Sequence, residues 1–216
     1  EISVVNQLRY GGIDFTRASL SSVADIMPEL NVLQLPYLYT SDEHMWRVLD
    51  GEIGDAFMDV FQNRDLVPLS WYDAGARSLY MEGEPVWSLE DLKGKKIRVP
   101  ESSLLADTMR ALGAEPVSMA FEKVYSALEK GICNGAENNW PSYQSTRHYE
   151  VAKYYTLDRH NRIPELQLIS RTTWEKLPEE YRQIIKQCGR ESAEYERKLW
   201  KEQEQISKDL VCKAGT

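Results

Sequence analysis

The fold is decided by residues 96–136, which read KIRVPESSLLADTMRALGAEPVSMAFEKVYSALEKGICNGA. Three short apolar runs in this stretch predict strands, at Lys96–Val99, Pro116–Met119 and Ile132–Ala136. The two segments between them have apolar residues at helical spacing and predict helices, at Ser103–Leu112 and Phe121–Lys130. This strand–helix order is typical of a parallel sheet, whose ligands bind at the carboxyl ends of the strands.

The residues before this stretch repeat the pattern less regularly. Strands are predicted at Ile13–Thr16 and Leu66–Trp71, with an extended piece at Asn31–Leu35. Helices are predicted at Ser19–Met27 and from an Asp42 cap through Phe61. From Pro178 to about Val211 nothing except Gly189 interrupts a helical pattern. The sequence therefore predicts two α/β lobes, crossed by the chain near Gly75 and Pro164, and one long helix that either spans both or kinks near Gly189.

Composition excludes several classes of protein. The chain has 216 residues, of which 42% are hydrophobic, with 6 Trp, 12 Tyr and 4 Phe, so it can bury enough surface to fold. The net charge of −8 argues against nucleic acid as a partner, because phosphate binding needs a basic face. No apolar run is long enough to cross a membrane, so we expect no direct membrane insertion.

Arg98 is the most informative residue, because it lies inside a predicted strand between Ile97 and Val99. Both faces of a parallel sheet are covered, so a guanidinium there is costly unless an anion pairs with it. One interpretation is a bidentate clamp for a ligand carboxylate. The alternative is an edge-strand arginine that pairs with Glu101 or Glu137.

Two further arginines give a weaker form of the same signal. Arg77 lies at the predicted crossing, and Arg17 follows the first predicted strand, where a parallel sheet presents its carboxyl end. Each one alone is typical of a surface arginine. Together with Arg98, in a chain of net charge −8, they indicate a positive pocket.

Residues 134–143, NGAENNWPSY, are rich in amides and aromatic rings that bind hydroxyls and pack on sugar faces. An ordinary turn is the alternative, since Asn-rich sequence ending in proline favours turns. No nucleotide-binding, P-loop, hydrolase or zinc-protease motif occurs, so we expect neither catalytic residues nor a cofactor. The one metal set that can be drawn matches no familiar spacing, and we expect no metal site; it comprises His148, Glu150, His160 and Glu165.

Several motifs, in this order and spacing, resemble the solute-binding proteins of tripartite ATP-independent periplasmic (TRAP) transporters, the DctP-type family. The motifs are Gly12–Phe15, Leu35–Leu38, Leu89–Pro100, Ala111–Ala114, Pro116–Phe121, Val124–Leu128, Gly135–Asn138, His148–Val151 and Leu177–Pro178. The resemblance implies a periplasmic-binding-protein-like fold of two α/β lobes, with crossing strands and a long helix that spans both. We expect lobe I to hold residues 1–75 plus 164–203, and lobe II residues 76–163 plus 204–216.

The resemblance also implies roles for individual residues. The arginine that pairs with the ligand carboxylate in the family matches Arg98, and the second pocket arginine matches Arg77. The pocket asparagine matches Asn138, and the aromatic residue lining the cleft matches Phe121. The residues that extend this segment, Asn139, Trp140, Ser142 and Tyr143, have a form associated with members that bind uronic and other sugar acids. Arg17 is a candidate for the ligand hydroxyls or the sugar ring oxygen.

Members of the family carry a further strand and helix before Asp14 and more chain after residue 216, so we expect both lobes to lack terminal parts. The resulting hypothesis is a periplasmic or extracytoplasmic receptor that closes on a small organic acid, a uronate above all, and delivers it to the membrane subunits of a TRAP transporter. Three alternatives stay open: a C4-dicarboxylate receptor, a sensing protein that docks on a receptor ectodomain, and a metal-dependent enzyme using His148 and His160.

Overall fold

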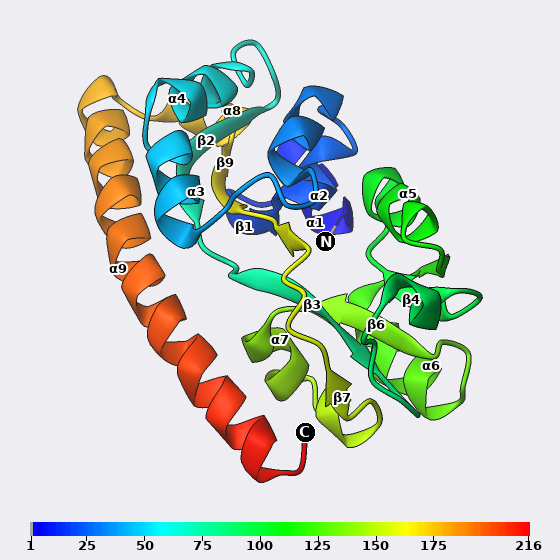
Figure 1. The fold of residues 1–216 in the computed structure, drawn as a ribbon. Coiled ribbons are helices and arrows are strands. Elements are labelled where there is room, and N and C mark those ends of the chain that lie inside the picture. Colours follow the sequence, from blue (N-terminus) through cyan, green and yellow to red (C-terminus); the bar gives the residue numbers. More distant parts are fainter. Residues whose placement is uncertain (1) are drawn as a thin grey trace. The chain divides into compact units, whose positions relative to one another are not determined.

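A computed structural model describes residues 2–216 as two compact units, and the predicted α/β fold is confirmed. Unit 1 contains residues up to 34, residues 38–74 and residues 163–200. Unit 2 contains residues 35–37, 75–162 and 201–216. Apart from the short excursion of residues 35–37, the chain passes from one unit to the other at Ala74–Gly75, at Arg162–Ile163 and within its last helix (Figure 1). Gly75 at the first of these crossings has a φ of 65°, which glycine adopts without strain.

Unit 2 is built on a six-stranded sheet with the order β5-β4-β6-β3-β7, in which β8 also pairs with β3. Its strands are β3 (Ala76–Met81), β4 (Lys96–Val99), β5 (Glu115–Ser118), β6 (Gly135–Asn138), β7 (Tyr154–Tyr155) and β8 (Asn161–Arg162). β4 pairs in parallel with β5 and β6, as the strand–helix order predicts, whereas β3 runs antiparallel to β6, β7 and β8. β4 is therefore an interior strand, with a neighbour on each side.

The helices of unit 2 begin and end close to the predicted residues. They are η2 (Leu89–Leu92), α5 (Ser103–Ala111), η3 (Phe121–Lys123), α6 (Val124–Glu129), α7 (Trp140–Ser145) and η4 (His148–Glu150). Ser102 caps α5 by accepting a hydrogen bond from the Leu105 amide, and Gly113 follows the helix with a φ of 92°. The predicted third strand was placed three residues too early, because Ile132 to Asn134 form the turn that leads into β6.

Unit 1 contains a three-stranded antiparallel sheet with the order β1-β9-β2. Its strands are β1 (Phe15–Ser19), β2 (Leu66–Tyr72) and β9 (Glu165–Ser170), and β2 carries a register shift between Pro68 and Ser70. The prediction for the first strand was wrong in one respect that matters for the site. Arg17 lies in the middle of β1, opposite Gln167 of β9, and does not follow the carboxyl end of a parallel strand.

The helices of unit 1 are more broken than predicted. They are α1 (Ile2–Arg9), α2 (Leu20–Ala24), η1 (Pro28–Gln34), α3 (Asp42–Leu49), α4 (Glu52–Asp59) and α8 (Arg171–Lys176). The predicted extended piece at Asn31–Leu35 falls mostly in the 3-10 helix η1. The single helix predicted from Asp42 is two helices, the first capped by Ser41, and Gly54 lets the second pack closely because a Cβ there would lie 1.9 Å from the Leu49 carbonyl oxygen.

The last helix, α9 (Glu179–Lys213), is continuous over 35 residues, as the sequence pattern predicts, and is drawn in orange to red in Figure 1. Residues up to Trp200 belong to unit 1, and the rest belong to unit 2. No helix in residues 2–216 is both long enough and apolar enough to cross a membrane.

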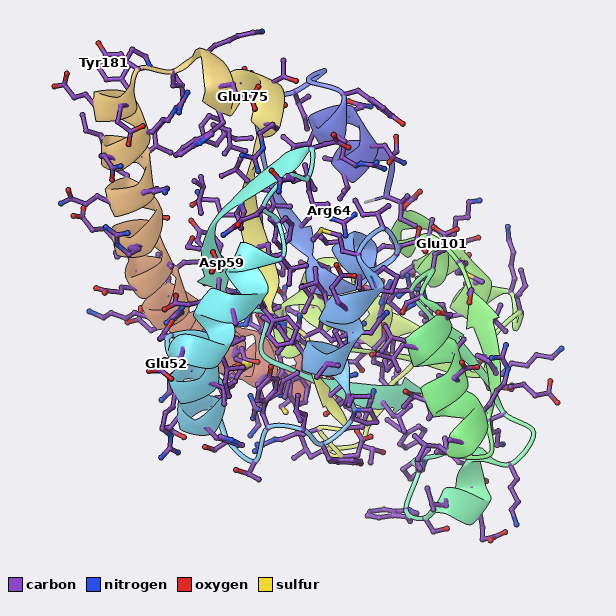
Figure 2. The ribbon with its side chains drawn as sticks, turned by 90° about the horizontal axis from the view of Figure 1, so that it is seen from above. Glu52, Asp59, Arg64, Glu101, Glu175 and Tyr181 are labelled. Atoms are coloured by element: carbon purple, nitrogen blue, oxygen red, sulfur yellow. The ribbon has the colours of Figure 1, made fainter. Side chains whose placement is uncertain are left out.

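Acidic side chains mark the surface, in keeping with the net charge of −8. Figure 2 shows Glu52, Asp59, Glu101 and Glu175 at the periphery, where all four are exposed to solvent.

Candidate functional site

Arg98 lies in the interior strand β4, opposite Val117 of β5 and Ala136 of β6, and only 2% of it is exposed. Its guanidinium donates two hydrogen bonds to one backbone oxygen, that of Met119, from Nε at 3.1 Å and from Nη2 at 2.7 Å. The ring of Phe121 lies 5.8 Å from the guanidinium carbon. These contacts fix the side chain, but in the part of the chain that the structure describes they leave its positive charge without a counter-ion.

The alternative interpretation of Arg98 does not hold in this structure. β4 is no edge strand, and within residues 2–216 neither Glu101 nor Glu137 forms an ion pair with Arg98. Burial lowers the pKa of this arginine, an effect that Glu137 opposes from a distance. A guanidinium keeps its proton at any physiological pH, so Arg98 presents a buried cation that an incoming carboxylate can neutralise.

Phe121 stands between Arg98 and a buried histidine. It is 39% exposed, and its ring meets the ring of His148 edge-on, with centroids 6.0 Å apart. His148 is 1% exposed, and its Nδ1 lies 2.8 Å from the Tyr80 hydroxyl. Burial and the nearby Arg98 charge lower the pKa of His148 to about 4, so this imidazole is neutral at pH 7.

Arg77, the second predicted arginine, is paired within the protein. Its guanidinium donates to both carboxylate oxygens of Glu137, one of them at 2.8 Å, and to the Glu137 backbone oxygen at 3.0 Å. Glu137 is fully buried in β6. Burial would raise the pKa of Glu137, but the Arg77 charge and His160 outweigh it and lower the pKa to about 2.

Two residues extend this ion pair into a row of alternating charges. His160 is fully buried, with Nε2 3.6 Å from Glu137 and Nδ1 2.7 Å from Asp158. Burial alone would lower the pKa of His160, but the hydrogen bond to Asp158 and the nearby negative charge of Glu137 raise it to about 9. The row Asp158, His160, Glu137, Arg77 is therefore charged throughout at pH 7, and its charges cancel.

Asn138 is the last residue of β6, and the two polar atoms of its side chain have different surroundings. Its Oδ1 faces Nη1 of Arg77 and the backbone N–H of Asn139, both at 2.9 Å. Both partners can only donate, so the atom facing them must be the amide oxygen. The amide nitrogen has no hydrogen-bond partner in residues 2–216, and it is a donor available to a ligand.

Asn139 and Trp140 have structural contacts that the sequence does not reveal. The side-chain oxygen of Asn139 caps α7 by accepting from the Ser142 amide at 2.8 Å. The indole of Trp140 stacks on Tyr155 with ring centroids 3.7 Å apart, and the Tyr155 hydroxyl donates to the Asn138 backbone oxygen. The predicted turn interpretation is thus only half right, because residues 140–145 form the short helix α7.

Arg17, the predicted site residue of unit 1, lies among acidic and aromatic side chains. It pairs with Glu165 of the neighbouring strand β9 and with Glu196 of α9, the latter at 3.5 Å. The rings of Tyr72 and Trp200 lie 5.6 and 5.1 Å from its guanidinium carbon. Two carboxylates therefore neutralise this arginine within its own unit.

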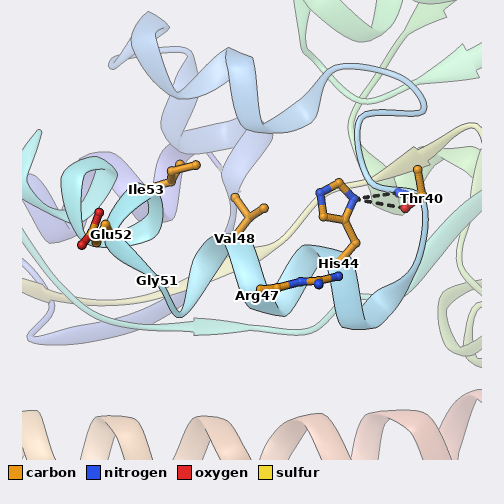
Figure 3. Close-up of a pocket in the computed structure, with 7 residues that line it drawn as sticks. All are labelled: Thr40, His44, Arg47, Val48, Gly51, Glu52 and Ile53. Carbon is orange, nitrogen blue, oxygen red and sulfur yellow. Dashed lines mark hydrogen bonds between the residues drawn. The ribbon is translucent and has the colours of Figure 1, made fainter.

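Unit 1 also has a solvent-open hollow between α3 and α4, shown in Figure 3. There His44 Nδ1 lies 3.2 Å from both the backbone nitrogen and the hydroxyl of Thr40. The hollow is lined by Thr40, His44, Arg47, Val48, Gly51, Glu52 and Ile53. Its one arginine and one glutamate offset each other, and it contains none of the residues predicted to bind a carboxylate.

The metal set drawn from the sequence is not assembled. Glu150 pairs with Arg147, His160 contacts Asp158, and Glu165 pairs with Arg17. In the part of the chain that the structure describes, no three residues of the His, Cys, Asp or Glu type are placed to hold a metal ion.

Sequence reasoning missed the groups that hold the arginines in place. The Met119 carbonyl, Tyr80 and Tyr155 carry no motif, and Asp158 and His160 are separated from Glu137 by 20 residues or more. Glu137 was considered only as a partner of Arg98. One signal in the sequence marks Glu137, namely a charged residue inside an apolar strand. That signal does not reveal which arginine pairs with Glu137.

The geometry invites comparison with proteins that bind small anions. A family model described as "Bacterial extracellular solute-binding protein, family 7", the DctP family, matches residues 1–216. The chain belongs to this family. The resemblance noted in the sequence is therefore confirmed.

Individual members of the DctP family agree closely with the chain. A solute-binding protein of Chromohalobacter salexigens is 40% identical over 211 residues, which are 98% of this chain and 63% of the relative. The chain thus spans less than two thirds of the length of that relative. A TRAP periplasmic solute-binding protein of Pseudomonas putida F1, solved with bound D-glucuronate, has a TM-score of 0.97 at 40% identity, covering all of this chain and 71% of the other. The corresponding protein of Xanthobacter autotrophicus Py2, with bound β-D-galacturonate, has a TM-score of 0.96 at 39% identity, covering 100% and 72%.

Proposed function

We propose that this DctP-family chain binds a uronate, of the glucuronate or galacturonate type, as the solute receptor of a TRAP transporter. The observation that carries the proposal is Arg98, a buried guanidinium in an interior strand with no counter-ion in residues 2–216. A carboxylate that accepts two parallel hydrogen bonds from such a group gains both energy and a fixed orientation. The bound uronates of the similar Pseudomonas and Xanthobacter proteins support the same class of ligand.

The remaining groups would read the rest of the ligand. The free amide nitrogen of Asn138 would donate to a ligand oxygen, and the half-exposed ring of Phe121 would pack on the sugar face. Arg77 would act indirectly, by holding the Asn138 oxygen so that the amide nitrogen is presented. Ligand contacts of Arg17, Asn139 and Trp140 stay predictions, and each of these residues also has a structural partner.

The charge state of the arginines favours an acid with one carboxylate over a C4-dicarboxylate. A dicarboxylate would need a second cation, and the predicted candidates are Arg77 and Arg17. Arg77 is paired with Glu137, and Arg17 with Glu165 and Glu196. Taking either arginine would leave a carboxylate unpaired, and for the fully buried Glu137 that costs several kcal/mol.

The partners and compartment follow from the family. We propose a periplasmic or extracytoplasmic location, delivery of the ligand to the membrane subunits of a TRAP transporter, and binding without chemical conversion. Closure of two lobes on the ligand is implied by the same resemblance. A sensing role, in which the loaded protein docks on a receptor ectodomain, uses the same site and stays the alternative.

Thermal unfolding with a panel of acids tests the proposal. The panel is glucuronate, galacturonate, gluconate, malate, succinate and sialate. A ligand at about 100 times its Kd stabilises the folded form by about 2.7 kcal/mol, a shift of several degrees for a chain of this size. We expect this shift with a uronate and not with malate or succinate. A shift with the dicarboxylates alone would replace the proposal by the dicarboxylate alternative.

A further inference from the structure

His148 is a buried histidine for which neither the sequence nor the family comparison assigns a role. It belongs to η4 and lies within an aromatic cluster, with its ring 5.7 Å from Tyr80 and 6.0 Å from Phe121. A phenylalanine would fill the same space among these rings. The polar atoms of the imidazole therefore need an explanation.

The hydrogen bond to Tyr80 fixes both the tautomer and the orientation of the ring. The Tyr80 hydroxyl is fully buried, and within residues 2–216 its one hydrogen-bond partner is Nδ1 of His148, at 2.8 Å. Burial raises the pKa of Tyr80, so the hydroxyl keeps its hydrogen. This hydrogen has an acceptor only if Tyr80 donates it to Nδ1. The neutral imidazole then carries its own hydrogen on Nε2, and the ring cannot rotate without leaving the hydroxyl unsatisfied.

Phe121 transmits this orientation to the candidate carboxylate site. Its edge meets the His148 ring at an interplanar angle of 72°, and its ring is also 5.8 Å from the Arg98 guanidinium carbon. Tyr80, His148, Phe121 and Arg98 therefore form a contiguous row from β3 to β4. A substitution at His148 would therefore alter the position of the Phe121 ring, which packs against Arg98.

We propose that His148 is a positioning residue of the ligand site, which holds Phe121 against Arg98, and that its Nδ1 takes up a proton when a carboxylate binds Arg98, so that Nδ1 then donates to the Tyr80 hydroxyl oxygen instead of accepting from it. This inference rests on the proposed function, because it needs an anion at Arg98. It adds a coupling between ligand and proton that the proposed function does not contain.

The electrostatics give the direction of the coupling. Burial and the Arg98 charge together lower the pKa of His148 to about 4. A bound carboxylate cancels the Arg98 charge, so the pKa of His148 rises on binding. By linkage, a group whose pKa rises on binding makes the ligand bind more tightly as the pH falls toward that pKa.

Other titratable groups around His148 do not reverse this direction. Tyr80 and Tyr143, from β3 and α7, have pKa values raised by burial and stay neutral. On η4 itself, Glu150 pairs with Arg147 and accepts a hydrogen bond from Tyr125 of α6. Within residues 2–216, Arg98 is thus the charge that shifts the pKa of His148.

Calorimetric titration with D-glucuronate at pH 7.5 and pH 4.5 tests the inference, using the wild type, His148→Phe and His44→Phe. If the His148 pKa rises by about one on binding, the wild type should bind D-glucuronate about threefold more tightly at pH 4.5 than at pH 7.5. His148→Phe keeps a ring against Phe121 but cannot take up a proton, so it should lack this gain. His44→Phe, which removes a histidine of unit 1, should retain it.

Buffers of different ionisation enthalpy provide a measurement that needs no variant. The wild type should take up about half a proton per ligand bound at pH 4.5 and none from His148 at pH 7.5. Equal pH profiles for wild type and His148→Phe, with no proton uptake, would overturn the inference and leave the uronate proposal standing. Failure of the wild type to bind any uronate at either pH would overturn both.

Discussion

Arg77 and Arg98 lie on two strands that flank β6, yet the structure gives their charges opposite fates. Arg77 meets both carboxylate oxygens and the backbone oxygen of Glu137, so its charge is neutralised inside the unit. Arg98 meets one backbone oxygen and one aromatic ring, neither of which carries a charge. One arginine is therefore part of a structural ion pair, and the other is the one that we propose to bind the ligand carboxylate.

The difference shows that burial of a cation does not by itself indicate a ligand. What separates the two arginines is whether the protein supplies the counter-ion. A buried ion pair costs desolvation energy that its partner largely repays, whereas a buried cation without a partner keeps that cost until an anion arrives. If Arg98 binds a carboxylate as we propose, relief of this desolvation cost would contribute to the affinity.

The largest effect on stability is expected when Arg77 loses its partner Glu137. Glu137→Gln leaves Arg77 and protonated His160 buried without a carboxylate between them, which should cost about 3–5 kcal/mol of the unfolding free energy of unit 2. Hydrogen exchange of peptides from β3 and β6 across a urea series measures it. Glu90→Gln removes an exposed partner of Lys93 and should cost less than about 1 kcal/mol. Equal losses in the two variants would contradict the pairing.

Substitution of Arg98 should show the reverse pattern, in which uronate affinity falls while the unfolding free energy stays nearly unchanged. Arg98→Ala removes the carboxylate partner and should weaken uronate binding by about 2 kcal/mol or more, about 30-fold. The fold should survive, because among the described residues Arg98 is held by the Met119 oxygen and the Phe121 ring alone. Calorimetric titration with D-glucuronate measures the loss, with the exposed Arg110→Ala of α5 as the matched control. Binding by Arg98→Ala as tight as that of the wild type would remove the basis of the proposed function.

Much of the framework around these arginines follows from the sequence. The order of strands and helices in residues 96–138, the Ser102 cap and Gly113 all follow local rules, and the position of Arg98 in a parallel strand follows from them. Local rules fail in unit 1 because its sheet is antiparallel and joins β1 and β2 to β9, which lies about 150 residues after β1 and about 100 after β2. Arg17 was misplaced for that reason.

The fate of each arginine could not be predicted, because it depends on contacts far apart in sequence. Arg77 and Glu137 are 60 residues apart and meet only when β3 pairs with β6. Asn139 has the same amide as Asn138, but its place before α7 uses its oxygen as a helix cap. Composition identifies the residue types that bind a sugar acid, and tertiary pairing decides which of them are available.

The pH dependence of the unfolding free energy should distinguish the charged His160 from the neutral His148. The pKa of His160 is raised from 6.5 to about 9, which corresponds to on the order of 3 kcal/mol of stability. A raised pKa contributes fully below pH 6.5, and the contribution is lost as the pH rises through 9. Unit 2 should therefore become easier to unfold between pH 7 and 10, as hydrogen exchange in urea would measure. His160→Gln should lower stability at pH 7 and flatten this alkaline decline, and an equal decline in both proteins would refute the assignment.

The smallest effect is expected at Asn138, the residue that touches the paired arginine and offers its nitrogen to the ligand. Asn138→Asp keeps an oxygen acceptor for Arg77 but replaces the amide donor with a second carboxylate beside Glu137, so uronate affinity should fall by about 1.5 kcal/mol, about tenfold. Asn134→Asp at the start of the same turn-to-strand segment is the matched control, because its oxygen likewise accepts a backbone hydrogen bond, from Lys96. Calorimetric titration of both variants with D-glucuronate distinguishes the two asparagines. If both variants bind as tightly as the wild type, the amide nitrogen of Asn138 does not face the ligand, and Arg98 acts without it.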